Sequence, residues 1–317
     1  MKLRDHDAVL VAAKRTPIGR AFKGSLVDRR GDDLAALAIK GAMADVPELA
    51  VNEVEDLILG CAQPAGEQGY NMARPVTLLA GLNEAAGTTV NRYCASSLQA
   101  LRMAFHAIRT GESDVQVAAG VEAISRYGLG KADGMEGTKN PQFSEPGNRL
   151  PDVYMAMGET AERVADQFGV TRDAMDRYAL ESQRRAALAI EKGWFEREIV
   201  AVPLSDGTVL DRDESPRPST TLEGLQSLRA VFREDGRVTA GNACPLNDGA
   251  AACVVMSGRR VSELGIQPRA RIRATAVSAV DPTIMGIGPV KATQRALKRA
   301  GMTIDDVDRV ELNEAFA

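Results

Sequence analysis

The sequence predicts a layered α/β fold built from two related halves. Short apolar runs alternate with amphipathic segments of helical spacing from residue 8 to residue 120, which is typical of helices packed on a sheet. The order strand, helix, acidic turn and strand returns near the end of the chain. Between these regions, polar stretches rich in Gly, Asn and Pro break the alternation. With 317 residues and 44% hydrophobic content, the chain is long enough for about two domains with a substantial core.

The first half is read from five segments. Residues 8–13 form a continuous apolar run, the pattern of a buried strand. Residues 32–43 carry apolar side chains at helical spacing and acidic residues in the first turn, which favours a helix. Residues 54–60 and 114–120 are predicted strands, and residues 71–80 are a predicted helix with a proline near its start.

One cysteine stands at a strand-to-helix transition. Residues 87–91 are short and β-prone, residues 95–110 contain no Pro or Gly, and Gly111 is placed to end the helix. Cys94 therefore lies where the first helical N–H groups are unpaired and the helix dipole is positive. Both effects favour the thiolate and raise its reactivity. The alternative is that Cys94 is a small inert hydrophobic residue, as buried cysteines commonly are.

The middle of the chain is an insertion that we expect to cover the α/β core. Residues 126–150 lack periodicity, and residues 203–222 are polar and rich in proline. Between them lie two predicted helices, 158–168 and 171–192, the second beginning with a threonine cap. A buried-strand pattern then returns at residues 250–256.

The last part of the chain repeats the order of the first. Residues 271–277 are a predicted strand, 289–300 a helix with proline near its start and glycine at its end, and 307–313 a second strand. Residues 54–60 likewise follow a helix and a short polar turn, so an internal duplication is predicted. The first copy continues for about sixty residues more, whereas the second stops soon after Asn313. A parallel sheet cut there would expose apolar faces, and we therefore expect a further C-terminal piece.

Composition excludes several classes of function. The net charge of −4 and the sequence pI of about 5.5 argue against general nucleic-acid binding. The four cysteines form no Cys-x-x-Cys pair and the chain has two histidines, so no metal site is expected. Cys61 and Cys253 lie on predicted buried strands and are expected to be inert. No run approaches the roughly 20 apolar residues of a membrane span, and few cysteines fit a reducing compartment, so we expect a cytoplasmic protein without membrane partners.

The two histidines do not supply an obvious base for Cys94. A cysteine nucleophile normally needs a base, and histidine is the usual one. His106 lies about 18 Å from Cys94 along the helix axis, at 1.5 Å per residue, and is expected to be structural. His6 precedes the first strand with no motif around it. The chain thus has a candidate nucleophile without a histidine within reach.

Two further stretches are candidate ligand contacts. The loop at residues 241–250 is dense in Gly, Asn and Asp, which suits either an ordinary tight turn or close approach to a ligand. Residues 313–317 put polar groups at the end of a predicted strand, where open α/β sheets place ligands, unless the strand simply ends there. Arg217, between two prolines, and Phe232 could contact a ligand, although single residues of these kinds are more commonly ordinary surface or core.

Taken together, five motifs in order resemble the thiolase family, the acetyl-CoA C-acyltransferases, over the whole chain. The motifs are Lys14-Arg15-Thr16-Pro17-Ile18-Gly19, Asn91-Arg92-Tyr93-Cys94-Ala95-Ser96-Ser97, Met157-Gly158-Glu159-Thr160-Ala161-Glu162, residues 241–252, and Asn313-Glu314-Ala315-Phe316-Ala317. The resemblance implies a thiolase-like αβαβα layered fold of two duplicated halves with an inserted loop domain, the second half truncated. In these terms the domains are residues 1–121 (N-terminal half), 122–240 (inserted loop domain), 241–268 (returning last strand of the N-terminal half) and 269–317 (incomplete C-terminal half).

The resemblance also assigns site residues. Cys94 would be the nucleophile that carries the acyl group as a thioester, and its backbone N–H would contribute to an oxyanion hole. Asn313 would hold a water that helps to form another. The residues that would line the coenzyme A tunnel are Met157, Arg217, Phe232, Ala240, Gly241, Cys244 and Phe316. Cys244 stands where many members carry Ser, and Ala156 stands where the biosynthetic branch carries His, which favours the degradative branch.

The implied reaction is ping-pong acyl transfer. Cys94 would attack a 3-ketoacyl-CoA, acetyl-CoA would leave, and CoA would accept the shortened acyl group, as in the β-oxidation of fatty acids; the reverse is Claisen condensation to acetoacetyl-CoA. Coenzyme A and acyl-CoA thioesters are thus substrates, with no tightly bound cofactor and no metal. The resemblance further implies a homodimer or homotetramer.

Two family motifs have no counterpart in this sequence. Family members carry a Gly-His-Pro motif, whose His activates the nucleophile, and a Cys-x-Gly-Gly-Gly motif, whose Cys is the acid/base for the second substrate. We therefore expect the chain alone to be inactive. One alternative is a non-catalytic CoA- or acyl-CoA-binding protein derived from a thiolase. A decarboxylating condensing enzyme of related fold is disfavoured, because such enzymes use Cys with two His.

Overall fold

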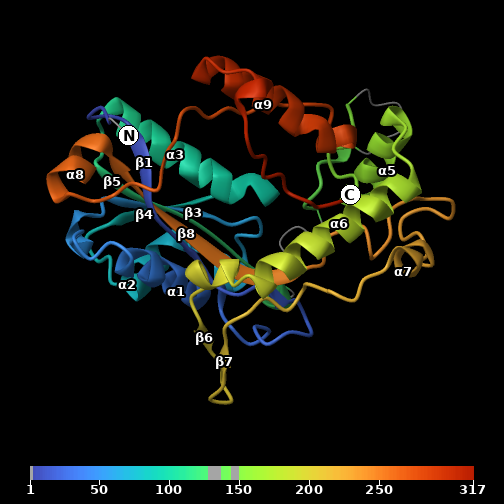
Figure 1. Ribbon diagram of the computed structural model, residues 1–317, viewed down its shortest axis with the longest axis horizontal. Helices are drawn as coiled ribbons and strands as arrows, with labels where there is room; N and C mark the ends of the chain where they lie inside the picture. The colour runs from blue at the N-terminus through green and yellow to red at the C-terminus, as the bar shows by residue number, and fades with distance from the viewer. Residues whose placement is uncertain (1–2, 128–136, 144–149) are drawn as a thin grey trace. The chain divides into compact units, whose positions relative to one another are not determined.

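The chain forms two compact units in the computed structural model, which describes residues 3–127, 137–143 and 150–317 (Figure 1). Unit 1 comprises Met1–Ala132, Gly193–Ser215 and Leu246–Ile272. Unit 2 comprises Asp133–Lys192, Pro216–Pro245 and Arg273–Ala317. Each unit therefore combines segments that are distant in sequence. These units are defined by compactness, whereas the predicted domains are defined by duplication and insertion. The predicted domain boundaries therefore stay a prediction.

Unit 1 contains the layered α/β structure that the sequence predicts. Its sheet has the order β4-β3-β5-β8-β1-β9, with β2 paired to β8. The strands are β1 (Ala8–Arg15), β2 (Gly19–Arg20), β3 (Asp56–Gly60), β4 (Ala86–Val90), β5 (Val115–Ala123), β8 (Asn247–Ser257) and β9 (Ala270–Arg271). β3 pairs in parallel with β4 and β5, whereas β8 runs antiparallel between β5 and β1. A late segment of the chain thus fills the centre of a sheet that the early segments begin.

Helices cover both faces of this sheet (Figure 1). Helices α1 (Gly31–Ala44) and α2 (Ala73–Ala80) pack on one face, and α3 (Ser96–Thr110) packs on the other. Successive residues of a strand point to opposite faces, so Leu57 of β3 lies in the α1 core while its neighbour Ile58 lies in the α3 core. Strands buried on both faces need continuous apolar runs, which is why these segments are recognisable in the sequence.

Two glycines let α3 begin close to the sheet. Gly60 of β3 and Gly120 of β5 are register partners. A Cβ atom on Gly60 would lie 2.5 Å from the backbone of Ser96 and Ser97, and one on Gly120 would lie 2.3 Å from Ser97 Oγ. Neither side chain could be accommodated without displacement, so these two positions set how closely the start of α3 approaches the strands.

Unit 1 also contains short elements that the sequence pattern did not predict. They are helix α4 (Ile124–Tyr127), helix α8 (Gly258–Leu264) and the hairpin β6 (Val202–Pro203) and β7 (Val209–Leu210). The hairpin begins at the edge of the polar, proline-rich stretch 203–222, for which no strand is predicted. Two-residue strands carry too few residues for a period of two to be recognised in the sequence.

Unit 2 is largely helical. Its helices are α5 (Met157–Phe168), α6 (Arg172–Glu191), α7 (Leu222–Gln226) and α9 (Gly288–Ala300). The predicted cap is confirmed, because Thr171 Oγ1 accepts the Ala174 N–H at 3.2 Å. Gly169 and Gly301 end α5 and α9 with φ of 66° and 67°, the left-handed conformation that favours glycine. The long predicted helices of this unit are therefore confirmed.

Two predicted strands of the last segment do not form. Of residues 271–277 only Arg271 belongs to a strand, and residues 307–313 belong to none. A strand is held by pairing, and the apolar pattern alone supplies no partner. One carbonyl of the first segment is instead bound by α9, where Arg299 Nη1 donates to the Thr275 oxygen at 2.6 Å.

The turn that follows the helix does recur in both places. Helix α1 is followed by the one-turn 3₁₀ helix Val51–Glu53, and α9 is followed by Ile304–Asp306. In each turn the carboxylate of the third residue accepts the N–H of the residue before the turn, at 3.3 Å and 2.8 Å. This shared geometry supports the predicted duplication for the helix and acidic turn.

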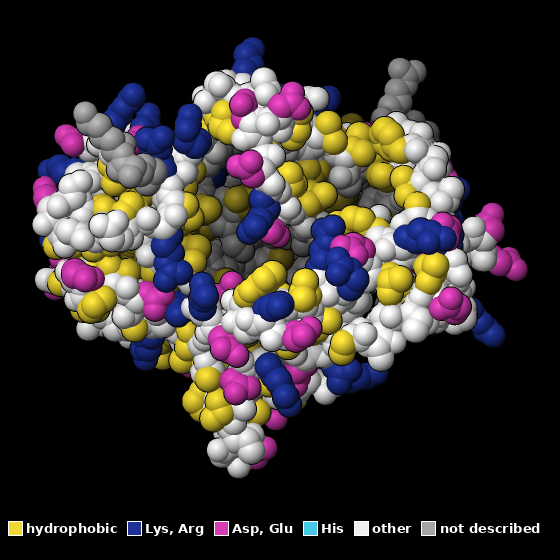
Figure 2. All heavy atoms as spheres, viewed as in Figure 1, with side chains coloured by type: hydrophobic (Ala, Val, Ile, Leu, Met, Phe, Trp, Pro, Cys, Tyr) yellow, Lys and Arg dark blue, Asp and Glu magenta, His cyan; other side chains and the backbone are white. Residues whose placement is uncertain are grey.

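Surface charge is mixed on the face viewed in Figure 2. Basic and acidic side chains lie interspersed among apolar ones, in keeping with 39 Lys and Arg residues against 43 Asp and Glu residues. Such a distribution offers a polyanion little attraction on this face, because neighbouring charges of opposite sign cancel over a short distance.

Candidate active site

Cys94 lies in the one-turn 3₁₀ helix Tyr93–Ala95, which leads directly into α3. This confirms its predicted place at a strand-to-helix transition, since β4 ends at Val90. The thiol is exposed, which argues against an inert buried cysteine. Tyr93 has φ of 45°, in the left-handed region, where a residue with a side chain costs about 1–3 kcal/mol. The backbone is therefore strained at the residue before the thiol.

The backbone N–H of Cys94 differs from those of its neighbours. Arg92 N donates to Ser96 Oγ at 2.8 Å, Tyr93 N donates to Asn91 Oδ1 at 2.7 Å, and Ala95 N donates to the Arg92 carbonyl at 3.0 Å. Among the residues that the structure describes, the Cys94 N–H has no acceptor. An oxygen atom bound beside the thiol would therefore meet a donor that the loop does not use internally.

A half-buried carboxylate of the sheet supports this loop. Glu122 of β5 accepts Gln68 Nε2 at 2.7 Å and the Ala62 N–H at 2.8 Å. The Ala62 carbonyl then accepts Asn91 Nδ2 at 3.0 Å, and the other end of the Asn91 side chain binds Tyr93. Burial raises the pKa of the Glu122 carboxyl. The chain of bonds thus connects the end of the sheet to the strained turn.

Neither histidine lies at this end of α3. His106 is about 15 Å along the helix from Ser96, at 1.5 Å per residue. His6 packs against Gly111, the residue that ends α3, where a Cβ atom would lie 3.1 Å from His6 Cε1. Both imidazoles therefore stand near the far end of the helix that Cys94 precedes.

In unit 2, the loop of the fourth motif pairs with residues 315–317. Cys244 N donates to the Ala315 carbonyl at 3.0 Å, and Ala317 N donates to the Asn242 carbonyl at 2.8 Å. A bridge between Ala243 and Phe316 lies between these two bonds. Two segments separated by about seventy residues are thereby joined in a short antiparallel pairing.

Four of the seven residues predicted to contact coenzyme A lie on these two segments, and two of them, Cys244 and Phe316, belong to the pairing itself. Ala240, Gly241 and Cys244 lie on the loop, and Phe316 lies on the paired segment. Asn313 is exposed and precedes the paired residues by a short stretch. Its predicted strand is absent, so the pairing of residues 315–317, rather than a sheet, holds this end of the segment.

Two more predicted contacts meet at the start of α5. Met157 is the first residue of α5, and a Cβ atom on the next residue, Gly158, would lie 2.0 Å from Cε2 of the Phe232 ring. The ring therefore lies against the first turn of the helix, beside Met157. Arg217 is held through its backbone, where its N–H donates to Gln183 Oε1 at 2.7 Å and its carbonyl accepts Thr220 Oγ1 at 2.7 Å. Its side chain is exposed.

The remaining thiols differ in exposure. Cys244 is exposed like Cys94, whereas Cys61 is buried. Burial, with the Glu122 carboxylate nearby, raises the pKa of the Cys61 thiol to about 12, and burial also raises the pKa of Cys253. These two are poor nucleophiles at neutral pH, as the sequence predicts.

The described residues contain neither a metal-binding cluster nor a membrane-spanning helix. No group of three or more His, Cys, Asp or Glu side chains there could hold a metal ion. No helix in residues 3–127, 137–143 and 150–317 is both long and apolar enough to cross a membrane.

Sequence reasoning missed three groups that shape these loops. They are the glycine pair Gly60 and Gly120, the carboxylate Glu122, and the amide of Asn242. Each acts on residues distant in sequence, so periodicity could not find it. A signal was nonetheless present, because a glycine that ends an apolar strand and a carboxylate in a buried strand both break the expected pattern.

Comparison with known proteins places the chain. Residues 8–259 match the family described as thiolase, N-terminal domain, and residues 266–317 match thiolase, C-terminal domain. A 3-oxoadipyl-CoA/3-oxo-5,6-dehydrosuberyl-CoA thiolase of Escherichia coli is 44% identical, over 98% of this chain and 81% of that protein. A 3-ketoacyl-CoA thiolase of Bacillus subtilis is 42% identical, over the same shares of the two chains.

Solved structures agree with this placement. Human mitochondrial 3-ketoacyl-CoA thiolase in complex with CoA superposes with a TM-score of 0.86 at 35% identity, over 99% of this chain and 81% of that one. The Bacillus anthracis acetyl-CoA acetyltransferase gives a TM-score of 0.87 at 36% identity, over 99% and 82%. The α/β fold, the ordered motifs and these matches establish that the chain belongs to the thiolase family.

Proposed function

We propose that this protein is a thiolase-type acyltransferase that cleaves 3-ketoacyl-CoA with CoA through an acyl thioester on Cys94. The observation that carries the proposal is the exposed Cys94 thiol beside its own unused backbone N–H at the start of α3. A thiol supplies the nucleophile, and a fixed N–H stabilises the oxyanion that forms next to it. Membership of the thiolase family supports this reading, and the relatives' names support the substrate class.

The chemistry has two halves. The Cys94 thiolate attacks the 3-keto carbon, a carbon–sulfur bond forms, and the keto oxygen becomes an oxyanion. When the carbonyl reforms, the bond between carbons 2 and 3 breaks, and the electron pair leaves with the acetyl-CoA fragment, which takes up a proton. A CoA thiolate then attacks the acyl thioester, and Cys94 leaves as a thiolate. The sum is 3-ketoacyl-CoA plus CoA to acetyl-CoA plus the shortened acyl-CoA; the reverse is Claisen condensation.

Unit 2 would supply the coenzyme contacts and a second polar group. The loop with Ala240, Gly241 and Cys244 offers backbone and a thiol, and the Phe232 ring against α5 offers an apolar surface for the pantetheine chain. Arg217 presents an exposed cation, which suits a phosphate. In the same proposal Asn313 holds a water for the thioester oxygen. The solved human relative in complex with CoA supports this ligand class.

We further propose that these 317 residues alone turn over slowly. The sequence contains two histidines, and both lie toward the far end of α3 from the thiol, so neither can take its proton directly. The same observation favours a second candidate, a non-catalytic protein that binds CoA or acyl-CoA. In either case we propose a homodimer or homotetramer in the cytoplasm, where exposed thiols remain reduced.

Acylation of Cys94 distinguishes the two candidates. The chain is incubated with acetoacetyl-CoA, quenched with acid, and analysed by peptide mass spectrometry. The enzyme proposal expects an acetyl group on the Cys94 peptide, absent in Cys94→Ala and retained in Cys244→Ala. CoA binding without acylation, even when an imidazole buffer supplies a base, would favour the binding protein. If the chain shows neither CoA binding nor acylation of Cys94, both candidates are rejected.

A further inference from the structure

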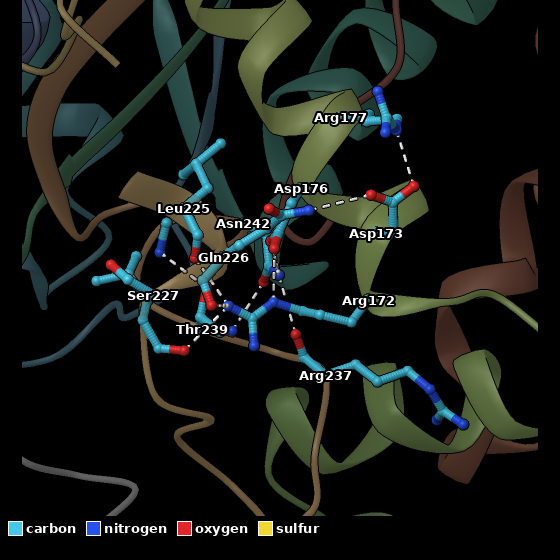
Figure 3. Close-up of polar contacts among 12 residues, drawn as sticks. Arg172, Asp173, Asp176, Arg177, Leu225, Gln226, Ser227, Arg237, Thr239 and Asn242 are labelled. Atoms are coloured by element: carbon cyan, nitrogen blue, oxygen red, sulfur yellow. Dashed lines mark hydrogen bonds and ion pairs between the residues drawn. The ribbon is translucent and has the colours of Figure 1, made fainter. Parts of the chain in front are cut away.

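The loop that carries the proposed coenzyme contacts is held by one buried asparagine (Figure 3). Asn242 is 3% exposed. Its side-chain oxygen accepts the Thr239 N–H at 2.8 Å, and its amide nitrogen donates to Asp176 Oδ1 and to the Arg237 carbonyl, each at 2.9 Å. The single amide group therefore fixes both sides of the turn from residue 237 to residue 242.

The Asn242 amide is held by Asp176, which in turn forms an ion pair with Arg172 (Figure 3). Asp176 of α6 is fully buried and accepts Arg172 Nε at 2.7 Å. Arg172 Nη2 also donates to the carbonyls of Leu225 and Leu228, at 2.8 Å and 3.0 Å. The side chains of these two leucines lie under Gly241, where a Cβ atom would be 2.5–2.6 Å from them. Helix α6, the end of α7 and the coenzyme loop are thus packed through one set of bonds.

The backbone of Asn242 faces the last segment. Its carbonyl accepts the Ala317 N–H at 2.8 Å, and two residues later Cys244 N donates to the Ala315 carbonyl. The residue whose side chain is anchored on α6 is therefore also a pairing residue for the segment that carries Asn313. A change in the orientation of Asn242 must move both segments.

We propose that Asn242 is a positioning residue that sets the coenzyme contacts of the 239–245 loop and the placement of residues 313–317 together. This inference rests on the proposed function, because it concerns the same coenzyme site. The role needs an amide, which accepts from a backbone N–H and donates to a carboxylate at the same time. Alanine can do neither, and an ionised aspartate can only accept.

The test substitution is Asn242→Asp, which keeps the shape of the side chain and replaces the donating amide nitrogen by an accepting carboxylate oxygen. At about pH 8 it would place a second carboxylate against Asp176, and two carboxylates in one site repel unless they share a proton. The charged groups packed around the position are Arg172 and Asp176 of α6, Glu162 of α5, and Arg237, whose guanidinium binds Asp166. Of these groups, Arg172 is the one bonded to Asp176, and it already makes that bond in the native chain.

The measurement is CoA affinity by calorimetry at about pH 8 and about pH 5.5, where a shared proton can return. Relative to the native chain, we expect Asn242→Asp to bind CoA about tenfold more weakly at the higher pH, which is about 1.4 kcal/mol, and to recover most of that loss at the lower pH. Asn242→Ala should be weak at both. Asn52→Asp, the same charge change at an exposed position of unit 1, should match the native chain. A purely structural defect would not be repaired by protons, so equal losses at both pH values overturn the inference.

Amide hydrogen exchange tests the coupling without a ligand. At about pH 8, Asn242→Asp should exchange faster than the native chain in peptides covering both 239–245 and 313–317, and Asn52→Asp in neither. Faster exchange in the loop alone would overturn the coupling of the two segments. If the native chain binds no CoA, the coenzyme part of the proposed function fails, and exchange still decides whether Asn242 joins the two segments.

Discussion

Replacing Gly60 by alanine should displace the start of α3 and with it the Cys94 loop. A Cβ atom there would lie 2.5 Å from the carbonyl carbon of Ser96 and the nitrogen of Ser97. These are backbone atoms of a helix, so no side-chain rotation can relieve the overlap. Inserting one carbon into a packed site costs about 1–3 kcal/mol, and we expect the upper part of that range here.

The register partner Gly120 provides a graded comparison. Its added Cβ would meet Ser97 Oγ at 2.3 Å and Ser97 Cβ at 2.8 Å. The hydroxyl can rotate away, so the overlap that remains is with the single atom Ser97 Cβ. Gly120→Ala should therefore cost less, about 1 kcal/mol or somewhat more. Gly288→Ala is the control, because its Cβ would have only Val280 Cγ2 nearby, at 3.9 Å, and its φ of −50° suits alanine.

Urea unfolding and the rate of Cys94 alkylation by iodoacetamide measure the two consequences. The free energy of unfolding should fall in the order Gly288→Ala, Gly120→Ala, Gly60→Ala. Alkylation of Cys94, measured against Cys244 in the same sample, should change most in Gly60→Ala, because the loop rests on the displaced helix start. If Gly60→Ala is as stable as Gly288→Ala and its Cys94 is alkylated at the native rate, the glycine pair does not set how closely the start of α3 approaches the strands.

Three further outcomes are expected. In the native chain, iodoacetamide should label Cys94 and Cys244 well before Cys61, whose pKa of about 12 leaves almost no thiolate; early labelling of Cys61 would contradict its burial. Burial raises the pKa of Glu122 above its unfolded value, so the ionised form costs stability at high pH and this cost disappears as pH falls through the folded pKa. The native chain should therefore gain stability relative to Glu122→Gln between about pH 8 and pH 5 in urea unfolding, and a constant difference would refute the reasoning. Tyr93→Gly should remove the strain at φ 45° and leave the unfolding free energy unchanged or higher by up to about 1 kcal/mol, yet slow acylation by acetoacetyl-CoA as the loop loosens; acylation at the native rate would show that the strained turn is dispensable.

Local signals were sufficient for the helix that follows Cys94. A run without Pro or Gly and a glycine in the left-handed conformation at Gly111 depend on neighbouring residues alone. The strands expected at 271–277 and 307–313 failed for the opposite reason. Their apolar pattern is that of a strand, but a strand also requires a partner, and pairing is not encoded within the segment itself.

The candidate site shows the same limit. Cys94 and the 241–250 loop stood out because their residue types are unusual in place. The groups that hold them did not, because Gly60 touches α3 from another strand and Asn242 meets Asp176 on a distant helix. Such contacts depend on the completed packing, and a single sequence gives each of these residues an ordinary alternative reading.

The two candidate loops are supported by one arrangement of side chains. In unit 1, Glu122 binds the Ala62 N–H, and the Ala62 carbonyl binds the Asn91 amide that holds the turn before Cys94. In unit 2, Asp176 binds the Asn242 amide directly. In both, a carboxylate gives rigidity from within the fold while a neutral amide faces the loop. A carboxylate bonded directly to the Cys94 turn would oppose both a thiolate and an oxyanion, because like charges repel most strongly where water is scarce. Placing the neutral Asn91 between Glu122 and the Cys94 turn fixes the shape of that turn without placing a negative charge where the proposed reaction develops one.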